Sequence, residues 1–476
     1  MPISFWILLI ATPILTLVAV GLFGSLFAVR WVRAFLWTLL NRPISETVSE
    51  LLVSSLSTPP LDLLYVSMRS AKGDVIIRPM GSPKPRKSFD DLSFVPAQLA
   101  RLPRGEAEEA HLGVTVGGRA RRPLQLRLPV FVSGMAYGLA LSREARLALA
   151  EGARRAGIPL NSGQGPFFEE ERERAGLYVL QFGRWTWNRS EEILHRADMI
   201  EIQVGQGAMP GNAVLSTPGS IGPEIRELMG LGRDEPPTIH ANLFLEDPGR
   251  VASLHEVVSY LRGATPDIPL AVKFGAGDDL EADIDVALES GVDVIVIDGT
   301  EGATGNAPIT LSDHFGLPSL IALVRARRHL EEAGRTDVDL LISGGFREPG
   351  DIMKALALGA KAVGLATIPM FAIAHSRLTS ALPFHPPTDL VFYKTPHPIP
   401  IDIEEGARGL ENFLESTKRE MAIALKTMGH TDVGELGPGD LSTLNEEVAR
   451  WCGVRYAGEA KPSGIPSRPL VAGKGV

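Results

Sequence analysis

Short apolar runs alternate with amphipathic stretches from residue 129 onward. Each run is rich in β-forming residues and ends in a Gly-rich or polar turn, after which apolar residues recur at helical spacing. We predict strands at residues 129–135, 158–163, 199–205, 238–244, 269–274, 292–299, 338–345 and 361–367. Apolar strands that alternate with helices in this way favour a parallel sheet closed into a (β/α)8 TIM barrel of the α/β class. A doubly wound sheet is the alternative, but it normally carries its Gly fingerprint after the first strand, whereas the turns richest in glycine here follow the last three.

The N-terminal segment has a different pattern. Residues 3–29 are apolar, and the first charged side chain is Arg30. This length exceeds the roughly 20 apolar residues that span a bilayer and predicts a transmembrane helix. A cleaved signal peptide is the alternative, but it normally begins with a basic region. Because Arg30, Arg33 and Arg42 follow the apolar run, we expect a single-pass membrane anchor with the catalytic domain in the cytoplasm.

The two patterns divide the chain into four parts. We assign residues 1–40 to the transmembrane anchor and juxtamembrane segment, 41–105 to a connector and N-terminal subdomain, 106–380 to the barrel, and 381–476 to a mostly helical C-terminal extension.

Composition and charge narrow the function. A hydrophobic content of 45% with 22% charged residues is ordinary for a globular enzyme. The formal net charge of -9 argues against a nucleic-acid partner, although Lys84 to Lys87 contains a short basic run. The single cysteine, Cys452, excludes an internal disulfide and any site that needs several thiolates. No group of His and carboxylate residues has metal-ligand spacing, so redox chemistry here requires an organic cofactor.

Glycine marks the turns after the last two predicted strands. Gly344 and Gly345 follow one strand, and Gly364 lies within the other, just before Leu365, Ala366 and Thr367. Barrels of this class commonly bind a phosphate at these two loops, so the backbone N–H groups here are candidates for a phosphate cradle. The alternative is that these glycines only shape tight turns.

Candidate site residues, several of them polar, lie at the ends of the other predicted strands, where barrels place their active sites. They are Ser133, Gly134 and Met135, then Gln164, Gln203, Gln206, Lys273, Glu301, Gly302, Thr304 and Gly305. Lys273 lies among apolar residues in "LAVKFG", where an unpaired charge would be costly. It therefore either pairs with an internal carboxylate, Glu201 or Asp298, or faces a ligand that becomes anionic.

Five motifs resemble the FMN-binding synthase domain of glutamate synthase in order and spacing. They are "PVFVSGMAYGLALSREARLALAEGA", "IEIQVGQGAMPGN", "LAVKFG", "VIDGTEGATGNAP" and "SGGFREPGDIMKALALGAKAVGLAT", within residues 89–373. The chain resembles in particular the stand-alone, membrane-anchored members known as glutamate synthase large subunit-like proteins.

The resemblance implies an FMN cofactor and assigns roles to residues. Ser133, Gly134 and Met135 would border the flavin ring, Gln206 and Lys273 would contact its polar edge, and the turns at Gly344, Gly345 and 364–367 would hold its phosphate. A fixed ammonium near that edge stabilises the negative charge of reduced flavin. Lys273, Gln206 and Glu301 are the catalytic candidates, although Glu301 is equally well explained as a solvated loop carboxylate. Gln164, Gln203, Gly302, Thr304 and Gly305 are the substrate candidates.

The chain also departs from the pattern of that family. The stretch after the last predicted strand has no cysteine, so we expect no iron–sulfur cluster. We also expect no glutaminase domain ahead of the barrel, since residues 1–100 are taken up by the predicted anchor and connector. Gln164, Gln203 and Met209 are neutral where the family pattern is charged, so a dicarboxylate such as 2-oxoglutarate would lose charge-assisted bonds worth roughly 1.5 to 3 kcal/mol each.

Three functions remain open from the sequence. The first is an FMN oxidoreductase that forms glutamate by reductive amination, with electrons from an external donor or partner subunit. The second is a membrane-linked FMN dehydrogenase or reductase acting on a different small-molecule substrate. The third is a flavin-binding scaffold without turnover, which the presence of Lys273 argues against.

Overall fold

The computed structural model describes residues 3–459, except residues 208, 212–213, 215, 303–304 and 306. The described residues form two compact units that divide between Ile76 and Ile77. The first unit is helical, with α1 (Ile3–Asn41), α2 (Ser49–Ser57) and α3 (Pro60–Lys72). Within α1, Thr16–Asn41 is long and apolar enough to cross a membrane, by length and composition.

The second unit contains a closed barrel of parallel strands, which confirms the predicted (β/α)8 TIM barrel. The order around the barrel is β10-β11-β4-β5-β6-β7-β8-β9. The strands are β4 (Val130–Val132), β5 (Pro159–Asn161), β6 (Leu177–Gly183), β7 (Met199–Gln203), β8 (Leu270–Gly275), β9 (Val294–Asp298), β10 (Asp339–Ser343) and β11 (Ala362–Leu365).

One predicted strand is wrong. Residues 238–244 form no barrel strand; Ile239 makes only an isolated bridge with Val214. The barrel instead uses β6, whose sequence LYVLQFG pairs with β5 and β7. Gln203 therefore ends the fourth barrel strand rather than the third.

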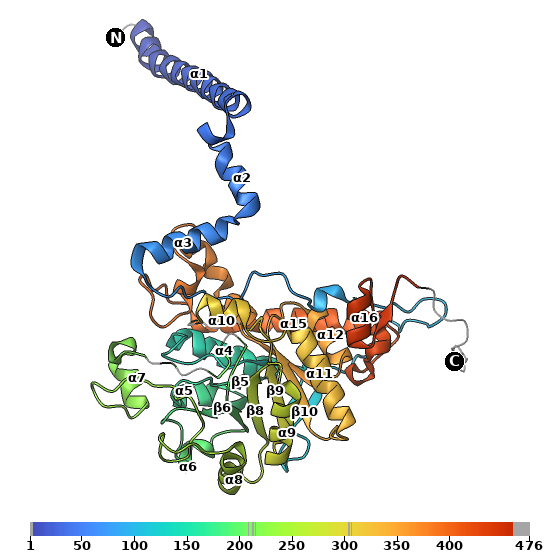
Figure 1. Cartoon of the computed structure of the whole chain (residues 1–476). Coiled ribbons are helices and arrows are strands. Elements are labelled where there is room, and N and C mark those ends of the chain that lie inside the picture. Colours follow the sequence, from blue (N-terminus) through green and yellow to red (C-terminus); the bar gives the residue numbers. More distant parts are fainter. Residues whose placement is uncertain are drawn as a thin grey trace. The chain divides into compact units, whose positions relative to one another are not determined.

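Helices surround the strands, and the longest of the C-terminal part, α15, packs against α4 (Figure 1). Ser142 begins α4 by accepting a hydrogen bond from the Ala145 N–H, and Gly157 ends it in the left-handed conformation that glycine favours. The helices of this unit are α4 (Arg143–Ala156), α5 (Glu169–Arg174), α6 (Glu191–Leu194), α7 (Pro223–Leu228), α8 (Leu254–Ala264), α9 (Leu280–Ser290), α10 (Ile309–His314), α11 (Ser319–Glu332), α12 (Pro349–Ala357), α13 (Thr367–Ala374), α14 (Leu378–Ala381), α15 (Ile403–Thr427) and α16 (Glu446–Cys452).

The two ends of the barrel interior differ in polarity. At the N-terminal end, the hairpin of β2 (Val114–Val116) and β3 (Leu124–Leu126) packs its apolar side chains against the first residues of the strands. Toward the C-terminal end the interior becomes polar, with the buried side chains Asn161, Gln181, Glu201, Gln203, Lys273, Asp298 and Ser343. These polar side chains are placed to meet a ligand at the C-terminal end of the barrel.

The C-terminal extension is tied to the start of the barrel unit. A small sheet joins β1 (Ser93–Phe94) to β12 (Leu441–Thr443), which also pairs with β13 (Arg455–Tyr456). The extension is mostly helical, as predicted, because α15 dominates it.

Candidate functional site

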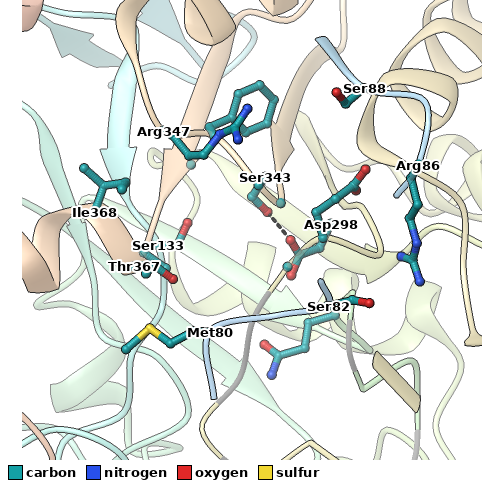
Figure 2. Close-up of a pocket in the computed structure, with 18 of the residues that line it drawn as sticks. Met80, Ser82, Arg86, Ser88, Ser133, Asp298, Ser343, Arg347, Thr367 and Ile368 are labelled. Carbon is teal, nitrogen blue, oxygen red and sulfur yellow. Dashed lines mark hydrogen bonds between the residues drawn. The ribbon is translucent and has the colours of Figure 1, made fainter. Parts of the chain in front are cut away.

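A cavity of about 700 Å³ opens at the C-terminal end of the barrel. This volume lies within the range of small-molecule and cofactor sites. Figure 2 shows its lining, with Ser133 and Thr367 on one side and Arg86 on the other. A second cavity of about 100 Å³ adjoins it, and both are lined by Met80, Gly134, Gln206, Ala366 and Thr367.

The structure brings most of the predicted site residues together around these two cavities. Those that line the larger one are Ser133, Gly134, Gln206, Lys273, Glu301, Gly302, Gly344, Gly345, Gly364, Ala366 and Thr367. Those found only at the smaller one are Met135, Gln164 and Gly305.

Three predicted site residues are not found in the lining of either cavity. Leu365 and Gln203 line neither cavity, because both are buried in barrel strands. The Leu365 carbonyl instead accepts a hydrogen bond from the Ser133 N–H, which links β11 to the loop after β4. Thr304 lies outside the described residues.

Lys273 occupies the polar layer of the barrel and also faces the larger cavity. Its Nζ lies 3.4 Å from Asp298 Oδ2, and its side chain is 5% exposed. Burial would lower the pKa of Lys273, but the charges of Asp298 and Glu201 outweigh it and raise the pKa above its usual value. The sequence left two explanations for Lys273, a pair with an internal carboxylate or a position facing a ligand. The two are compatible, since the ammonium lies near Asp298 and the side chain also lines the cavity.

Hydrogen bonds from neutral groups hold both carboxylates near Lys273. Asp298 accepts from the Ser343 hydroxyl at 2.7 Å, the bond drawn in Figure 2, and from the Gly207 N–H at 3.1 Å. Glu201 accepts from the amides of Asn161 and Gln181 at 2.9 and 2.8 Å. This network keeps an ammonium charged in a buried position.

Glu301 is fixed at the start of α11 rather than solvated. Its Oε2 accepts from the Ser319 N–H at 2.8 Å and from the Ser319 hydroxyl at 2.9 Å. Burial raises the pKa of Glu301 despite these bonds. A carboxylate at a helix N-terminus is stabilised by the helix dipole, so its first role is to hold the loop after β9 against α11.

The glycines of the last two turns are required by protein packing as well as by any ligand. A Cβ on Gly364 would lie 2.5 Å from Ser133 Oγ, and one on Gly345 would lie 2.7 Å from Glu301 Cβ. Gly344 and Gly345 also have φ of 111° and 82°, which side chains disfavour. The glycines therefore let the strand ends approach one another. From the sequence alone, this reason for glycine could not be told apart from close approach to a phosphate.

Several polar groups at these turns have no partner within the described part of the protein. The N–H groups of Gly344, Gly345 and Phe346 donate to no described acceptor. The buried hydroxyl of Ser133 likewise has no hydrogen-bond partner among the described residues. Since buried polar groups are rarely left unpaired, this set fits an anionic or polar ligand in the larger cavity.

Residues 77–91, which we name the crossing segment, form a wall of the larger cavity that the sequence did not reveal. Arg78 and Ser82 both hydrogen bond to Asp313 of α10, and Arg86 donates to Thr300 and, at 3.0 Å, to the Asp313 carbonyl. The signal available in the sequence was the basic run at Lys84 to Lys87, which brings Lys84 and Arg86 to the cavity.

The far end of the crossing segment is attached to the loop after β10 and to α12. Arg347 Nη2 lies 2.9 Å from Asp90 Oδ1, and the hydrogen bond from Arg347 lowers the pKa of Asp90. Lys354 of α12 donates to the Phe89 carbonyl at 2.9 Å. Both ends of the wall are therefore fixed to the barrel.

The fold and the site define a TIM barrel with a cofactor-sized cavity at the C-terminal strand ends. The model of the conserved region in glutamate synthase matches residues 82–431. The chain belongs to this family.

Relatives extend over most of the chain. The glutamate synthase large subunit-like protein of Rhizobium meliloti (strain 1021) is 30% identical over 424 residues, which cover 83% of this chain and 93% of that protein. The archaeal-type glutamate synthase (NADPH) of Dehalococcoides mccartyi is 30% identical over 360 residues, 71% of this chain and 68% of that protein. These matches confirm the predicted family.

Solved structures with a similar chain course have lower sequence identity. A flavocytochrome b2 variant with pyruvate bound is 18% identical, with a TM-score of 0.48 over 74% of this chain and 76% of that one. The monotopic membrane protein (S)-mandelate dehydrogenase is 19% identical, with a TM-score of 0.48 over 74% of this chain and 88% of that one. The fold assignment rests on the closed barrel itself.

Proposed function

We propose that this protein is an FMN-dependent oxidoreductase whose cofactor occupies the larger cavity. The observation that carries the proposal is the buried Lys273, which is held charged by Asp298 and Glu201 and faces that cavity. A buried ammonium is costly unless it is paired, and one beside a cofactor-sized cavity is suited to stabilise a ligand that gains negative charge.

The residues of the larger cavity fit FMN at both of its ends. The N–H groups of Gly344, Gly345 and Phe346, which donate to no acceptor among the described residues, would bind the phosphate. Gly134 and Gln206 line both cavities, and they would border the ring together with the hydroxyl of Ser133, which lines the larger cavity. FMN, when bound, supplies a ring that transfers two electrons as a hydride equivalent.

Two side chains of the cavity would then support the chemistry of the bound flavin. Lys273 keeps a fixed positive charge in the cavity, which raises the reduction potential of a flavin beside it. Glu301, whose pKa burial raises, is one of the carboxyl groups of the cavity wall and could hold a proton there.

For the reaction, the first candidate is reductive amination that gives glutamate, with electrons from an external donor or partner subunit. The names of the relatives support it. The second candidate is oxidation or reduction of a different substrate, and the uncharged lining of the smaller cavity favours it.

We further propose that α1 anchors the protein in a membrane as a single-pass helix. Thr16–Asn41 supports this by its length and composition. The arginines after the apolar run support a catalytic unit on the cytoplasmic side. A protein lacking residues 1–41 should then leave the membrane fraction, whereas full-length protein that is soluble without detergent would contradict the anchor.

The test of the proposed function is the absorption spectrum of full-length protein purified in detergent. We expect bound flavin that is released as FMN on denaturation. Anaerobic addition of NADH, NADPH, reduced ferredoxin and quinol in turn should identify the donor by loss of flavin absorbance. Protein without flavin would contradict the proposal, and flavin that no donor or substrate reduces would favour the scaffold.

A further inference from the structure

The smaller cavity differs from the larger one in the charge of its lining. Most of its lining residues are apolar, with Met135, Leu139, Leu141, Met370 and Phe392 among them. Its polar side chains are the three glutamines Gln164, Gln181 and Gln206, together with Thr367. We name this cavity the glutamine compartment.

Two of the three glutamine amides are free to bind a ligand. The amide of Gln181 already has a protein partner, because its Nε2 donates a hydrogen bond to Glu201 at 2.8 Å. The side-chain amides of Gln164 and Gln206 form no hydrogen bond with another residue in the described part of the chain, and each offers one acceptor and two N–H donors.

The backbone of both residues makes hydrogen bonds to other residues. The Gln164 carbonyl accepts from the indole of Trp187 at 3.0 Å. Gln206 and Met209 exchange two backbone hydrogen bonds, at 3.0 and 3.3 Å. Gln206 also lines the larger cavity, whereas the Gln164 amide lies in the compartment alone, so Gln164 is the amide placed to recognise one polar group of a ligand there.

No charged side chain lines the compartment among the described residues. Lys273 lines the larger cavity, where it pairs with Asp298, and does not line the compartment. A carboxylate in the compartment would therefore lose its water without gaining a cationic partner, which is strongly unfavourable. An uncharged polar group loses far less, because amides can replace its hydrogen bonds.

We propose that the glutamine compartment is the substrate subsite and that it selects a small uncharged molecule, with an apolar part and one carboxamide, carbonyl or hydroxyl group. The proposal rests on the proposed function in one respect, that the cofactor occupies the adjoining larger cavity. A volume of about 100 Å³ limits the buried part of the substrate to a few non-hydrogen atoms, since a cavity of roughly 150 Å³ holds a benzene molecule.

The first experiment compares matched neutral and anionic probes on the full-length protein in detergent. Butyramide and butyrate have the same size and differ in charge, and 2-oxoglutarate represents the dicarboxylates. Binding is followed by the change in the flavin spectrum and by thermal stabilisation. We expect butyramide to bind at least about tenfold more tightly than butyrate, and 2-oxoglutarate to bind more weakly than butyramide. Equal or tighter binding of either anion, or no saturable response to butyramide, overturns the proposal.

Variants locate the binding within the compartment. Gln164→Leu removes one free amide and should weaken butyramide binding about tenfold with unchanged flavin content. Gln125→Leu is the control, because Gln125 is exposed on the hairpin at the other end of the barrel. Leu139→Lys adds a cation to the compartment wall and should reverse the preference toward butyrate. Unchanged selectivity in Leu139→Lys, together with unchanged affinity in Gln164→Leu, places the binding elsewhere and overturns the proposal.

The outcome separates this inference from the proposed function. Protein that carries no flavin contradicts the proposed function, whereas thermal stabilisation by butyramide is measured with or without flavin. Flavin-containing protein that prefers 2-oxoglutarate contradicts the inference alone.

Discussion

Arg146 and Glu171 form a buried, two-bond ion pair beneath the loops that border the cavity. Arg146 Nε and Nη2 lie 2.5 and 2.7 Å from the two oxygens of Glu171. The same guanidinium donates to the carbonyls of Met135 at 2.6 Å and Asn161 at 3.0 Å. One side chain of α4 therefore fixes the ends of both β4 and β5, where the predicted flavin-facing residues begin.

Removing this cation should destabilise the fold and loosen the cofactor together. Arg146→Met leaves the Glu171 carboxylate buried without its partner, which typically costs about 3 to 5 kcal/mol. Arg154→Met is the matched control on the same helix, because Arg154 is half exposed and its pair with Glu151 should be worth at most about 1 kcal/mol. Urea unfolding measures the free energy of unfolding of the two variants. Equal losses in the two variants would contradict the role of Arg146.

Gly345→Ala should lower FMN retention through packing. The new Cβ would lie 2.7 Å from Glu301 Cβ at a residue with φ of 82°. Gly334→Ala is the control for backbone strain alone, because Gly334 has φ of 66° and no atom within 4 Å of the added Cβ. Flavin content after gel filtration is the measurement. We expect a clear loss only in Gly345→Ala, and equal flavin content in the two variants would contradict the packing argument.

The contribution of Asp313, which attaches the crossing segment to α10, to the free energy of unfolding should depend on pH. Burial alone would raise the pKa of Asp313, but hydrogen bonds from Arg78 and Ser82 lower it below its usual value. A lowered pKa contributes stability that is present above the ordinary Asp pKa of about 3.9 and is lost as the pH falls through the lowered value. We therefore expect Asp313→Asn to be less stable than the parent protein by a constant amount from pH 7 to about 5, with the difference shrinking below about pH 4.

Unfolding free energies across this pH range test the sign. Asp234→Asn removes an exposed carboxylate and should match the parent protein throughout. A difference between Asp313→Asn and the parent that grows toward acid would contradict the assignment.

The one cysteine should be chemically silent in the folded protein. Burial raises the pKa of Cys452 to about 11, so at pH 8 the thiol is protonated as well as shielded. Only the thiolate reacts with disulfide reagents. We expect no reaction with Ellman's reagent in native protein and one equivalent after denaturation, while rapid reaction of the native protein would contradict the burial of Cys452.

The barrel could be predicted because its signal is local. Each strand and its following turn lie within a few residues, so apolar runs and glycines reveal them. The exception is instructive, because β6 is followed by the four-residue helix α6 and lacks a clear strand-helix alternation. The apolar stretch around Ile239 has a strand-like pattern, but strand pairing is decided by distant partners, and within the described residues it forms an isolated bridge with Val214.

The sequence predicted those site residues that lie at the ends of barrel strands, but not those that other segments bring to the cavity. Lys273 was recognisable because an isolated cation in an apolar strand needs a partner. The crossing segment was not, because it reaches the cavity through contacts such as Arg78 with Asp313, which are far apart in the sequence. The two roles of Gly345, packing against Glu301 and shaping the turn, likewise become visible only when the loops after β9 and β10 are brought together.

The central claim, that a charged Lys273 tunes a flavin in the larger cavity, is tested most directly by anaerobic redox titration of Lys273→Met. Loss of about 1.5 to 3 kcal/mol of stabilisation in the reduced state predicts a potential lower by roughly 30 to 65 mV for a two-electron couple. Arg262→Met is the control, because it breaks the pair with the buried Asp293 outside the cavity lining and should change stability without changing the potential. A potential in Lys273→Met equal to that of the parent protein would contradict the account.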